Sequence, residues 1–134
     1  MSDGISMDTS DLYSFFARMD NVPDELPKGV DGAMRGAAHT GKDAWQRGLE
    51  SSSVPAAAST IWYRFVGNAG RLSAAIENSR GSRRLRGYVY AREYGSPTVT
   101  PGAHAAAAAE AAAADLAKGL RVAGENAINR AMGA

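Results

Sequence analysis

Apolar residues recur at helical intervals in two stretches of the first 50 residues. The first stretch comprises Leu12, Phe15, Phe16 and Met19, at i, i+3, i+4 and i+7. This spacing predicts a short helical segment within residues 1–22, ended by Pro23. A longer helix is predicted over residues 24–50, where the apolar stripe comprises Leu26, Val30, Ala33, Met34, Ala37, Gly41, Ala44, Trp45 and Leu49. Most of that stripe is small, so we expect the longer helix to pack closely against another backbone.

The pattern changes from helical to extended after a loop at residues 51–55. Residues 59–66 and 86–94 are rich in β-branched and aromatic side chains and predict two strands. Residues 71–78 fit either a strand or a helical turn. In both predicted strands, aromatic or apolar side chains fall on both faces, so we expect each face of the sheet to need a cover.

A final helix is predicted to start at Thr100 and Pro101, which suit the N-cap and the first helical position, and to end at about Met132. Alanine, the best helix former, dominates its first half. These elements predict an α+β fold, in which a small antiparallel β-sheet is flanked by a long helix from the N-terminal half and an alanine-rich C-terminal helix. We expect residues 1–134 to form a single domain.

The composition indicates a thin hydrophobic core. Hydrophobic residues make up 45% of the 134 residues, but 27 of them are alanine. Alanine contributes little on burial compared with the roughly 1.5–3 kcal/mol of a large aliphatic side chain. We therefore expect the domain to complete its core against neighbouring molecules.

The sequence also excludes several classes of protein. It has no cysteine, which excludes disulfides, thiolate metal sites and a cysteine nucleophile. The first residues lack the basic and apolar regions of a signal peptide, and no apolar run approaches the length of a membrane span. We expect a soluble protein made in the cytoplasm, with no membrane partner.

Charge is distributed unevenly along the chain. Residues 1–50 carry nine acidic and five basic side chains, and residues 51–134 carry five acidic and ten basic ones. The resulting balance of −4 against +5 suits head-to-tail self-association or a basic face for nucleic acid. The alternative is that the same charges lie on two ordinary solvated faces with no binding role.

Catalytic chemistry has little support in the sequence. His39 and His104 are the only histidines, and neither has the spacing of a metal site. Residues 67–70 contain two glycines but lack the lysine and the following helix of a phosphate-binding loop. We expect no enzyme activity and no cofactor, and we assign no catalytic, cofactor-binding or metal-binding residue.

Residues 79–86 concentrate four arginines: Arg80, Arg83, Arg84 and Arg86. Because serine and glycine accompany them between two predicted extended segments, they predict a flexible, arginine-rich hairpin tip. Guanidinium groups suit phosphates or an acidic patch, so these four are candidate interface or DNA-proximal residues. The alternative is a solvated loop that protects a sheet edge.

Residues 90–96 form a Tyr-Ala-Arg-Glu-Tyr-Gly-Ser run, followed by a proline-containing loop and an alanine-rich helix. This order resembles the head-tail joining or minor tail (tail-completion, neck) family of long-tailed bacteriophages, and the resemblance covers most of the chain from about residue 24. The candidate motif and turn residues are Tyr90, Glu93, Tyr94 and Gly95. Gly95 permits a left-handed turn, Tyr94 offers an anchoring ring, and Glu93 is expected to pair with an arginine.

The resemblance implies a structural virion protein that assembles as a homo-oligomeric ring at the phage neck and joins the DNA-filled head to the tail around the genome channel. The implied partners are copies of itself, head-side connector or stopper proteins, tail-side terminator or tail tube proteins, and double-stranded DNA that passes without sequence-specific binding. The implied location is the virion, after synthesis in the host cytoplasm. Tight phosphate contacts would impede DNA passage, which favours docking between subunits for the arginines. The alternatives are a tail terminator ring that caps the tail tube and a small basic nucleic-acid-binding module.

Overall fold

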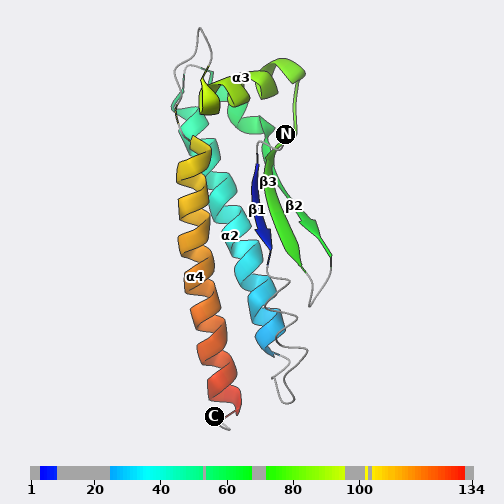
Figure 1. Cartoon of the computed structure of the whole chain (residues 1–134), viewed down its shortest axis with the longest axis vertical. Helices are drawn as coiled ribbons and strands as arrows, with labels where there is room; N and C mark the ends of the chain where they lie inside the picture. Colours follow the sequence, from blue (N-terminus) through cyan, green and yellow to red (C-terminus); the bar gives the residue numbers. More distant parts are fainter. Residues whose placement is uncertain are drawn as a thin grey trace.

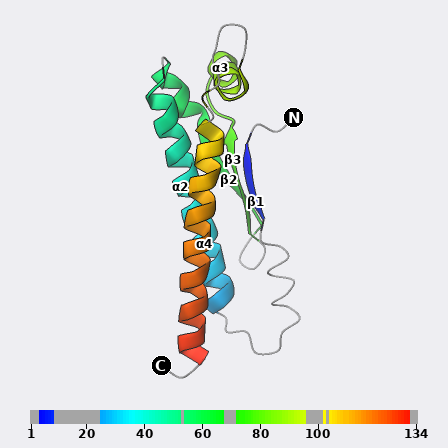
Figure 2. The ribbon, with the colours of Figure 1, turned by 60° about the vertical axis from the view of Figure 1, so that its left-hand side comes forward.

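Two long helices define the long axis of the molecule, and a small sheet lies on one side of them. The computed structural model describes residues 4–8, 25–52, 54–67, 72–95, 102 and 104–131. Helices α2 (Glu25–Glu50) and α4 (His104–Ala131) run antiparallel (Figure 1), and the strands lie to one side of the pair (Figure 2). This arrangement confirms the predicted α+β fold, with the long helix of the N-terminal half and the alanine-rich C-terminal helix in place. The ends predicted for the last helix lie outside the described residues.

The sheet has three antiparallel strands in the order β1-β3-β2. They are β1 (Ile5–Asp8), β2 (Ile61–Val66) and β3 (Ser73–Asn78). Strand β2 lies within the predicted strand and follows the 3-10 helix η1 (Pro55–Thr60), while β3 resolves the ambiguous segment as a strand.

Strand β1 was not predicted. It lies inside the segment 1–22, for which the sequence indicated only a helix, and four residues are too few to show a period-two pattern. The helix predicted from Leu12 to Met19 lies outside the described residues.

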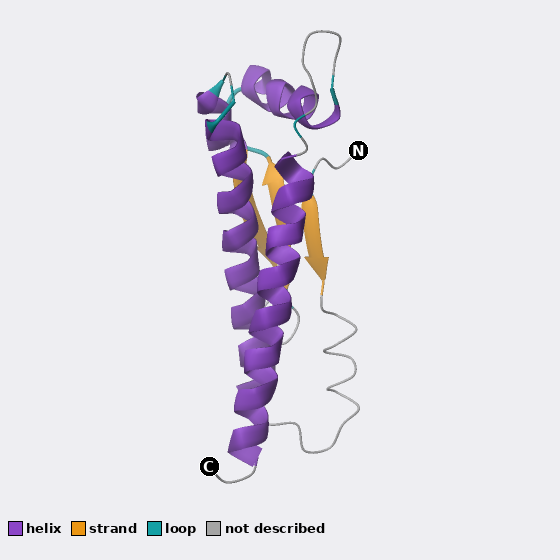
Figure 3. Cartoon of the chain, turned by 90° about the vertical axis from the view of Figure 1, so that its left-hand side faces the viewer, coloured by secondary structure: helices purple, strands orange, loops and turns teal. Residues whose placement is uncertain are grey.

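The sheet packs one face against the helices, with its side chains alternating between two faces. The buried and half-buried side chains on the helix side are Ile5, Met7, Ile61, Tyr63, Phe65, Ala74 and Ile76. Trp62, Arg64 and Val66 occupy the alternate positions of β2, where Val66 is 51% exposed. Apolar and aromatic side chains therefore lie on both faces of this strand, as the sequence predicted, and the described helices lie on only one side of the sheet (Figure 3).

Small residues let α2 approach both α4 and the sheet. A Cβ at Gly41 would collide with the side chain of Ile76 and lie 3.0 Å from the Cβ of Ala112. A Cβ at Gly29 would lie 2.7 Å from the Cβ of Ala123. The predicted close packing of this helix is confirmed, because these contacts leave no room for larger side chains.

Residues 83–94 form a helix, α3 (Arg83–Tyr94), which lies across one end of the molecule (Figure 1). The strand predicted over 86–94 is therefore wrong. The arginine-rich hairpin tip predicted over 79–86 is also wrong, because most of that segment is the loop before α3 and its first turn. Because residues 83–94 are helical, β2 is the one predicted strand with apolar side chains on both faces.

Local chemistry explains why this segment is helical. The hydroxyl of Ser82 accepts a hydrogen bond from the N–H of Leu85 and caps the start of the helix. Leu85, Tyr88 and Val89 follow at helical spacing and pack on the core, where Val89 is 1% exposed. Burial of this face outweighs the strand propensity of valine and tyrosine.

Candidate functional site

Helix α3 brings together the two groups of residues that the sequence singled out. It carries three arginines of the predicted cluster and three residues of the family motif: Arg83, Arg84, Arg86, Tyr90, Glu93 and Tyr94. The fourth motif residue, Gly95, ends the helix with a φ of 88°, in the region that favours glycine. The positive φ fits a sharp turn at Gly95, but its ψ of 160° is not that of a left-handed helical turn.

Glu93 fixes α3 to the start of α4. Its Oε2 accepts a hydrogen bond from the backbone N–H of Ala105 at 2.7 Å. This N–H lies in the first turn of α4, where an intrahelical acceptor is missing and the helix dipole favours an anion. The expected arginine partner of Glu93 stays a prediction, and the observed contact is a helix cap supplied by another helix.

The same junction places a histidine beside an arginine. The Nε of Arg92 lies 3.4 Å from the Nε2 of His104, the first residue of α4. Burial and the positive charge of Arg92 lower the pKa of His104, and the carboxylate of Glu93 acts in the opposite sense. The imidazole is thereby kept neutral at the helix N-terminus, where a positive charge is unfavourable.

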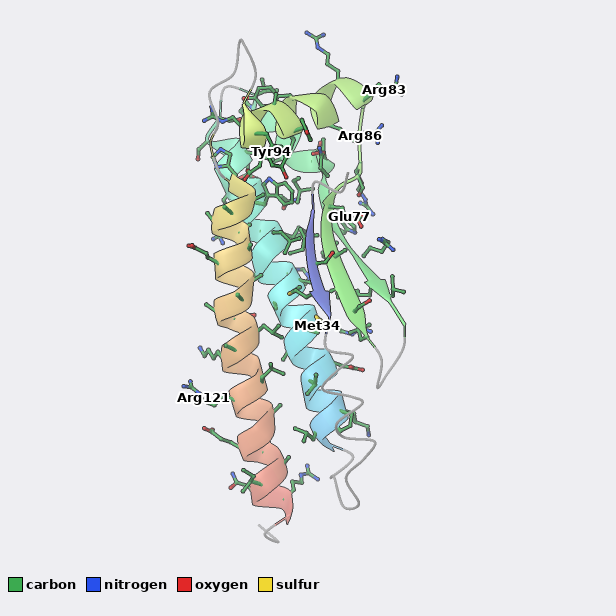
Figure 4. The ribbon with its side chains drawn as sticks, in the orientation of Figure 1. Met34, Glu77, Arg83, Arg86, Tyr94 and Arg121 are labelled. Carbon is green, nitrogen blue, oxygen red and sulfur yellow. The ribbon has the colours of Figure 1, made fainter. Side chains whose placement is uncertain are left out.

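The side of α3 that faces away from the core carries arginine and tyrosine. Arg83, Gly87, Tyr90 and Tyr94 follow one another at intervals of four, three and four, and all are exposed. We call these four residues, together with the exposed Arg84, the outer face of α3. The rings of Tyr90 and Tyr94 lie 4.8 Å apart and are 40% and 55% exposed. Figure 4 shows Arg83 and Tyr94 at opposite ends of the helix.

The four predicted arginines do not share one surface. Arg83 and Arg84 are exposed on α3, whereas Arg80 lies over the ring of Trp62, with its guanidinium carbon 4.0 Å from the ring centroid. Arg86 is half-buried, and its Nε has no hydrogen-bond partner among the described residues. The carbonyl of Arg86 accepts a hydrogen bond from Asn78.

A second surface, which the sequence did not reveal, lines the outer strand β2. Three side chains of α2 lie against its aromatic rings, and we call the whole set the basic-aromatic row: Arg35, His39, Lys42, Trp62, Tyr63, Phe65 and Arg80. Arg35 lies 4.7 Å from the ring centroid of Phe65, and Lys42 lies 4.9 Å from that of Trp62. At an exposed position such as that of Arg35, a contact of this kind contributes about 0.5–1 kcal/mol. Lys42 is buried, and its Nζ also lies 3.1 Å from the Oδ1 of Asp43. The sequence signal for this row was the i, i+4, i+7 spacing of Arg35, His39 and Lys42, which places them on one face of α2.

The backbone of β2 is open on the side away from β3. The carbonyl of Thr60 accepts from Ser79 and Arg80, whereas the carbonyl of Ile61 accepts from the side chain of Gln46 on α2. Because the direction of these groups alternates along a strand, the N–H and C=O groups of Tyr63 and Phe65 also point away from β3. Among the described strands, β2 and β1 each have a single neighbour.

The sheet face opposite the helices carries one close ion pair. Arg64 of β2 donates to the Oε1 of Glu77 on β3 at 2.7 Å. The hydrogen bond and charge of Glu77 raise the pKa of Arg64, which keeps the guanidinium charged. Figure 4 shows Glu77 on the sheet, below the Arg86 end of α3.

The described residues do not assemble a metal site. Within this part of the chain, no group of three or more histidine, aspartate or glutamate side chains is close enough to bind an ion. His39 bonds instead to the hydroxyl of Tyr63, with Nε2 and Oη 3.2 Å apart. None of the described helices is both long and apolar enough to cross a membrane.

Comparison with known proteins identifies no relative. No family model matches the chain, and searches of curated proteins and of solved structures found no match.

Proposed function

We propose that this chain is a structural virion protein that assembles head to tail into a ring at the neck of a long-tailed phage and joins the DNA-filled head to the tail. The resemblance in residues 90–96 supports the location at the neck. The observation that carries the ring is that two different strands, β1 and β2, each have a single neighbour among the described strands of the sheet.

The chain segments that form the two edges differ in charge. Strand β2 is lined by Arg35, Lys42 and Arg80 of the basic-aromatic row. Strand β1 belongs to residues 1–25, which contain six acidic residues and one arginine. A basic surface along β2 and a net acidic N-terminal segment favour contact between unlike surfaces, and such heterologous contacts form closed rings when the rotation between subunits closes.

The direction of the strands fits this contact. Both β1 and β2 run antiparallel to β3, so they run parallel to each other. The strands follow the long axis of the molecule (Figure 1), and rotation about an axis along the strands keeps their direction. The β2 edge of one copy therefore meets the β1 edge of the next in a parallel arrangement, and the sheet edges become the lateral contacts of the ring.

The alternative function, a nucleic-acid-binding module, needs the four arginines on one surface. They are divided between the basic-aromatic row, the half-buried position of Arg86 and the outer face of α3. This division favours protein contacts over a phosphate-binding patch.

The proposal is tested on particles and on the purified chain. Loss of the gene is expected to leave filled heads and complete tails that fail to join, whereas defective tail ends would indicate the tail terminator alternative. Mass photometry of the purified chain is expected to show a closed oligomer at high concentration. A stable monomer or dimer that binds duplex DNA in a salt-sensitive way would contradict the ring. The genomic neighbourhood gives a first check, since we expect genes for head and tail proteins on both sides.

A further inference from the structure

The first turn of α3 is electrostatically unfavourable. Arg83 and Arg84 occupy it, and the turn contains no acidic residue. A helix N-terminus carries partial positive charge, so two arginines there oppose the dipole. Neither arginine forms an ion pair with any described residue. These charges therefore weaken the helix that carries them, which indicates that they serve a contact outside the described fold.

The tyrosines of α3 are exposed on the same stripe. The rings of Tyr90 and Tyr94 contact each other at an interplanar angle of 49°, and Gly87 lies between them and Arg83 with nothing within 4 Å of the position of a Cβ. Glycine inside a helix costs about 1 kcal/mol relative to alanine, so this position also weakens the helix. The stripe therefore carries no side chain at Gly87, between the guanidinium groups at one end and the two phenol rings at the other. Tyrosine and arginine are the side chains enriched at the centres of protein interfaces.

The helix is nevertheless held firmly. Its inner face packs on the core through Leu85, Tyr88 and Val89, and Glu93 binds the start of α4. Ser82 and Gly95 define its two ends. A rigid helix presents its side chains in a fixed geometry, which lowers the entropy lost when a partner binds.

We propose that the outer face of α3 docks an acidic, partly apolar surface of a different protein. Carboxylates of that partner pair with Arg83 and Arg84, and an apolar side chain packs between Gly87 and the rings of Tyr90 and Tyr94. An acidic partner is favoured because Glu93, the only acidic residue of α3, is already bonded to α4 and leaves Arg83 and Arg84 without a carboxylate on their own helix.

The place of α3 in the fold indicates a different protein and not a second copy. The sheet edges face sideways, whereas α3 lies across one end of the long axis (Figure 1). In a ring built through the sheet edges, that end faces the neighbouring component along the neck. This identification of the partner rests on the proposed function, but the docking face itself does not. Two adjacent arginines beside phenol rings also suit a protein surface better than the evenly spaced phosphates of a duplex.

The test compares stability with binding in one charge-reversed variant. Replacing both arginines, Arg83→Glu with Arg84→Glu, is expected to raise the melting temperature by about 3 °C, because acids at a helix N-terminus are favourable. The same variant is expected to bind a fluorescein-labelled 12-residue peptide of alternating glutamate and leucine at least about tenfold more weakly. A lower melting temperature would show that the arginines support the fold, and it would overturn the proposal.

A matched control uses exposed cations on another helix. Lys118→Glu with Arg121→Glu on α4 reverses the same charge, and it is expected to leave peptide binding within about twofold. The pair Tyr90→Ala with Tyr94→Ala is expected to weaken binding while keeping its salt dependence. If the α4 control weakens peptide binding as much as the α3 variant does, the loss of binding comes from net charge alone, and the proposal is overturned. Tighter binding of a 20-base-pair duplex through the same arginines would identify nucleic acid as the occupant and overturn it as well.

Photo-crosslinking separates this face from the ring contacts. With p-benzoylphenylalanine in place of Tyr94, the purified chain is expected to crosslink the peptide and not itself. Covalent dimers through position 94 would identify a second copy as the occupant and overturn the proposal. The same probe in place of Phe65 is expected to give covalent dimers, and their absence would count against the proposed ring while leaving the peptide titration to decide the role of α3.

Discussion

The α3 end of the α2–α4 pair is packed with large side chains, whereas the two helices meet through glycine and alanine at the other end. Near α3, Trp45, Leu49 and Val89 are buried together with residues of the sheet. At the far end, Gly29 faces Ala123, and Gly119 faces Ala33 with its Cβ position 2.7 Å from the Cβ of that alanine. A trough of about 400 Å³ opens there, lined mostly by small residues.

This difference shows where the fold gains its stability. Hydrophobic stabilisation follows the apolar area removed from water, so the α3 end contributes most of it. The far end contributes close backbone contact and the buried side chain of Val30, while Val122 and Ile128 remain 45% and 60% exposed there. The α3 end is therefore the more densely packed part of the molecule, and it is the end that carries the arginine and tyrosine surface.

The largest expected effect is at the centre of the α3 end. Trp45→Ala is expected to lower the free energy of unfolding by about 3–5 kcal/mol, because it leaves a large cavity. Val30→Ala, at a buried position near the far end, is expected to cost about 1.5 kcal/mol for two methyl groups. Denaturant unfolding measures both values. Equal costs would mean that the two ends contribute equally and would break the comparison.

A pair of glycines tests the close helix contact at the far end. Gly29→Ala is expected to destabilise the fold by about 1–2 kcal/mol, because its Cβ would overlap Ala123. Gly32→Ala is the matched control, since nothing lies within 4 Å of its Cβ position, and it is expected to stabilise the helix by about 0.5–1 kcal/mol. Thermal unfolding of the two variants shows whether each substitution lowers or raises the stability of the fold. A stabilising Gly29→Ala would show that the helices are not in contact there.

The cap between α3 and α4 tests how firmly α3 is held. Glu93→Ala is expected to cost about 1 kcal/mol, because the N–H of Ala105 loses its acceptor. Glu93→Gln keeps an acceptor oxygen and is expected to cost less. Unfolding free energies of both variants provide the measurement, and an equal cost for the two would assign the effect to charge and not to the hydrogen bond.

The smallest expected effect is a pH dependence at the same junction. The pKa of His104 is lowered from its ordinary value of 6.5 by burial and by Arg92. As the pH falls below about 6.5, the unfolded chain takes up a proton that the folded chain does not, so stability falls. His104→Asn is expected to remove this contribution, and Arg92→Gln to reduce it. A stability difference between wild type and His104→Asn that is constant from pH 8 to pH 5 would contradict the assignment.

The sequence predicted the parts of the fold that have one strong periodicity. The apolar stripe of α2 and the alanine content of α4 each fit only a helix, and both were found. Strand β2 was found because residues 61–66 are dominated by β-branched and aromatic side chains, which favour a strand.

The prediction failed where two periodicities overlapped. Tyr88, Tyr90 and Tyr94 suggest alternation, while Leu85 and Val89 fit a helical face equally well. Only the packing of the helical face on the core decides between them, and that packing is a tertiary property. The arginine cluster was assigned to a hairpin for the same reason.

The basic-aromatic row could not be predicted from the sequence, because it also depends on tertiary packing. Its members come from α2, β2 and the loop before α3, and only folding places them together. The motif residues were found in sequence, but their roles follow from the helix, where Glu93 caps α4 and the tyrosines face outward.

The central claim is that the two unlike edges of the sheet join copies of the chain head to tail. Because the chain has no cysteine, the double variant Ser6→Cys with Arg64→Cys tests it directly. Both positions pair with Ala75 in one chain, which places them about 10 Å apart on either side of β3, too far for an internal disulfide. Oxidation is expected to give a ladder of covalent oligomers that ends in one closed species, and each single variant is expected to give none beyond a trace of dimer. Efficient dimers from Arg64→Cys alone, or a double variant that stays monomeric at concentrations where the wild type forms oligomers, would contradict the account.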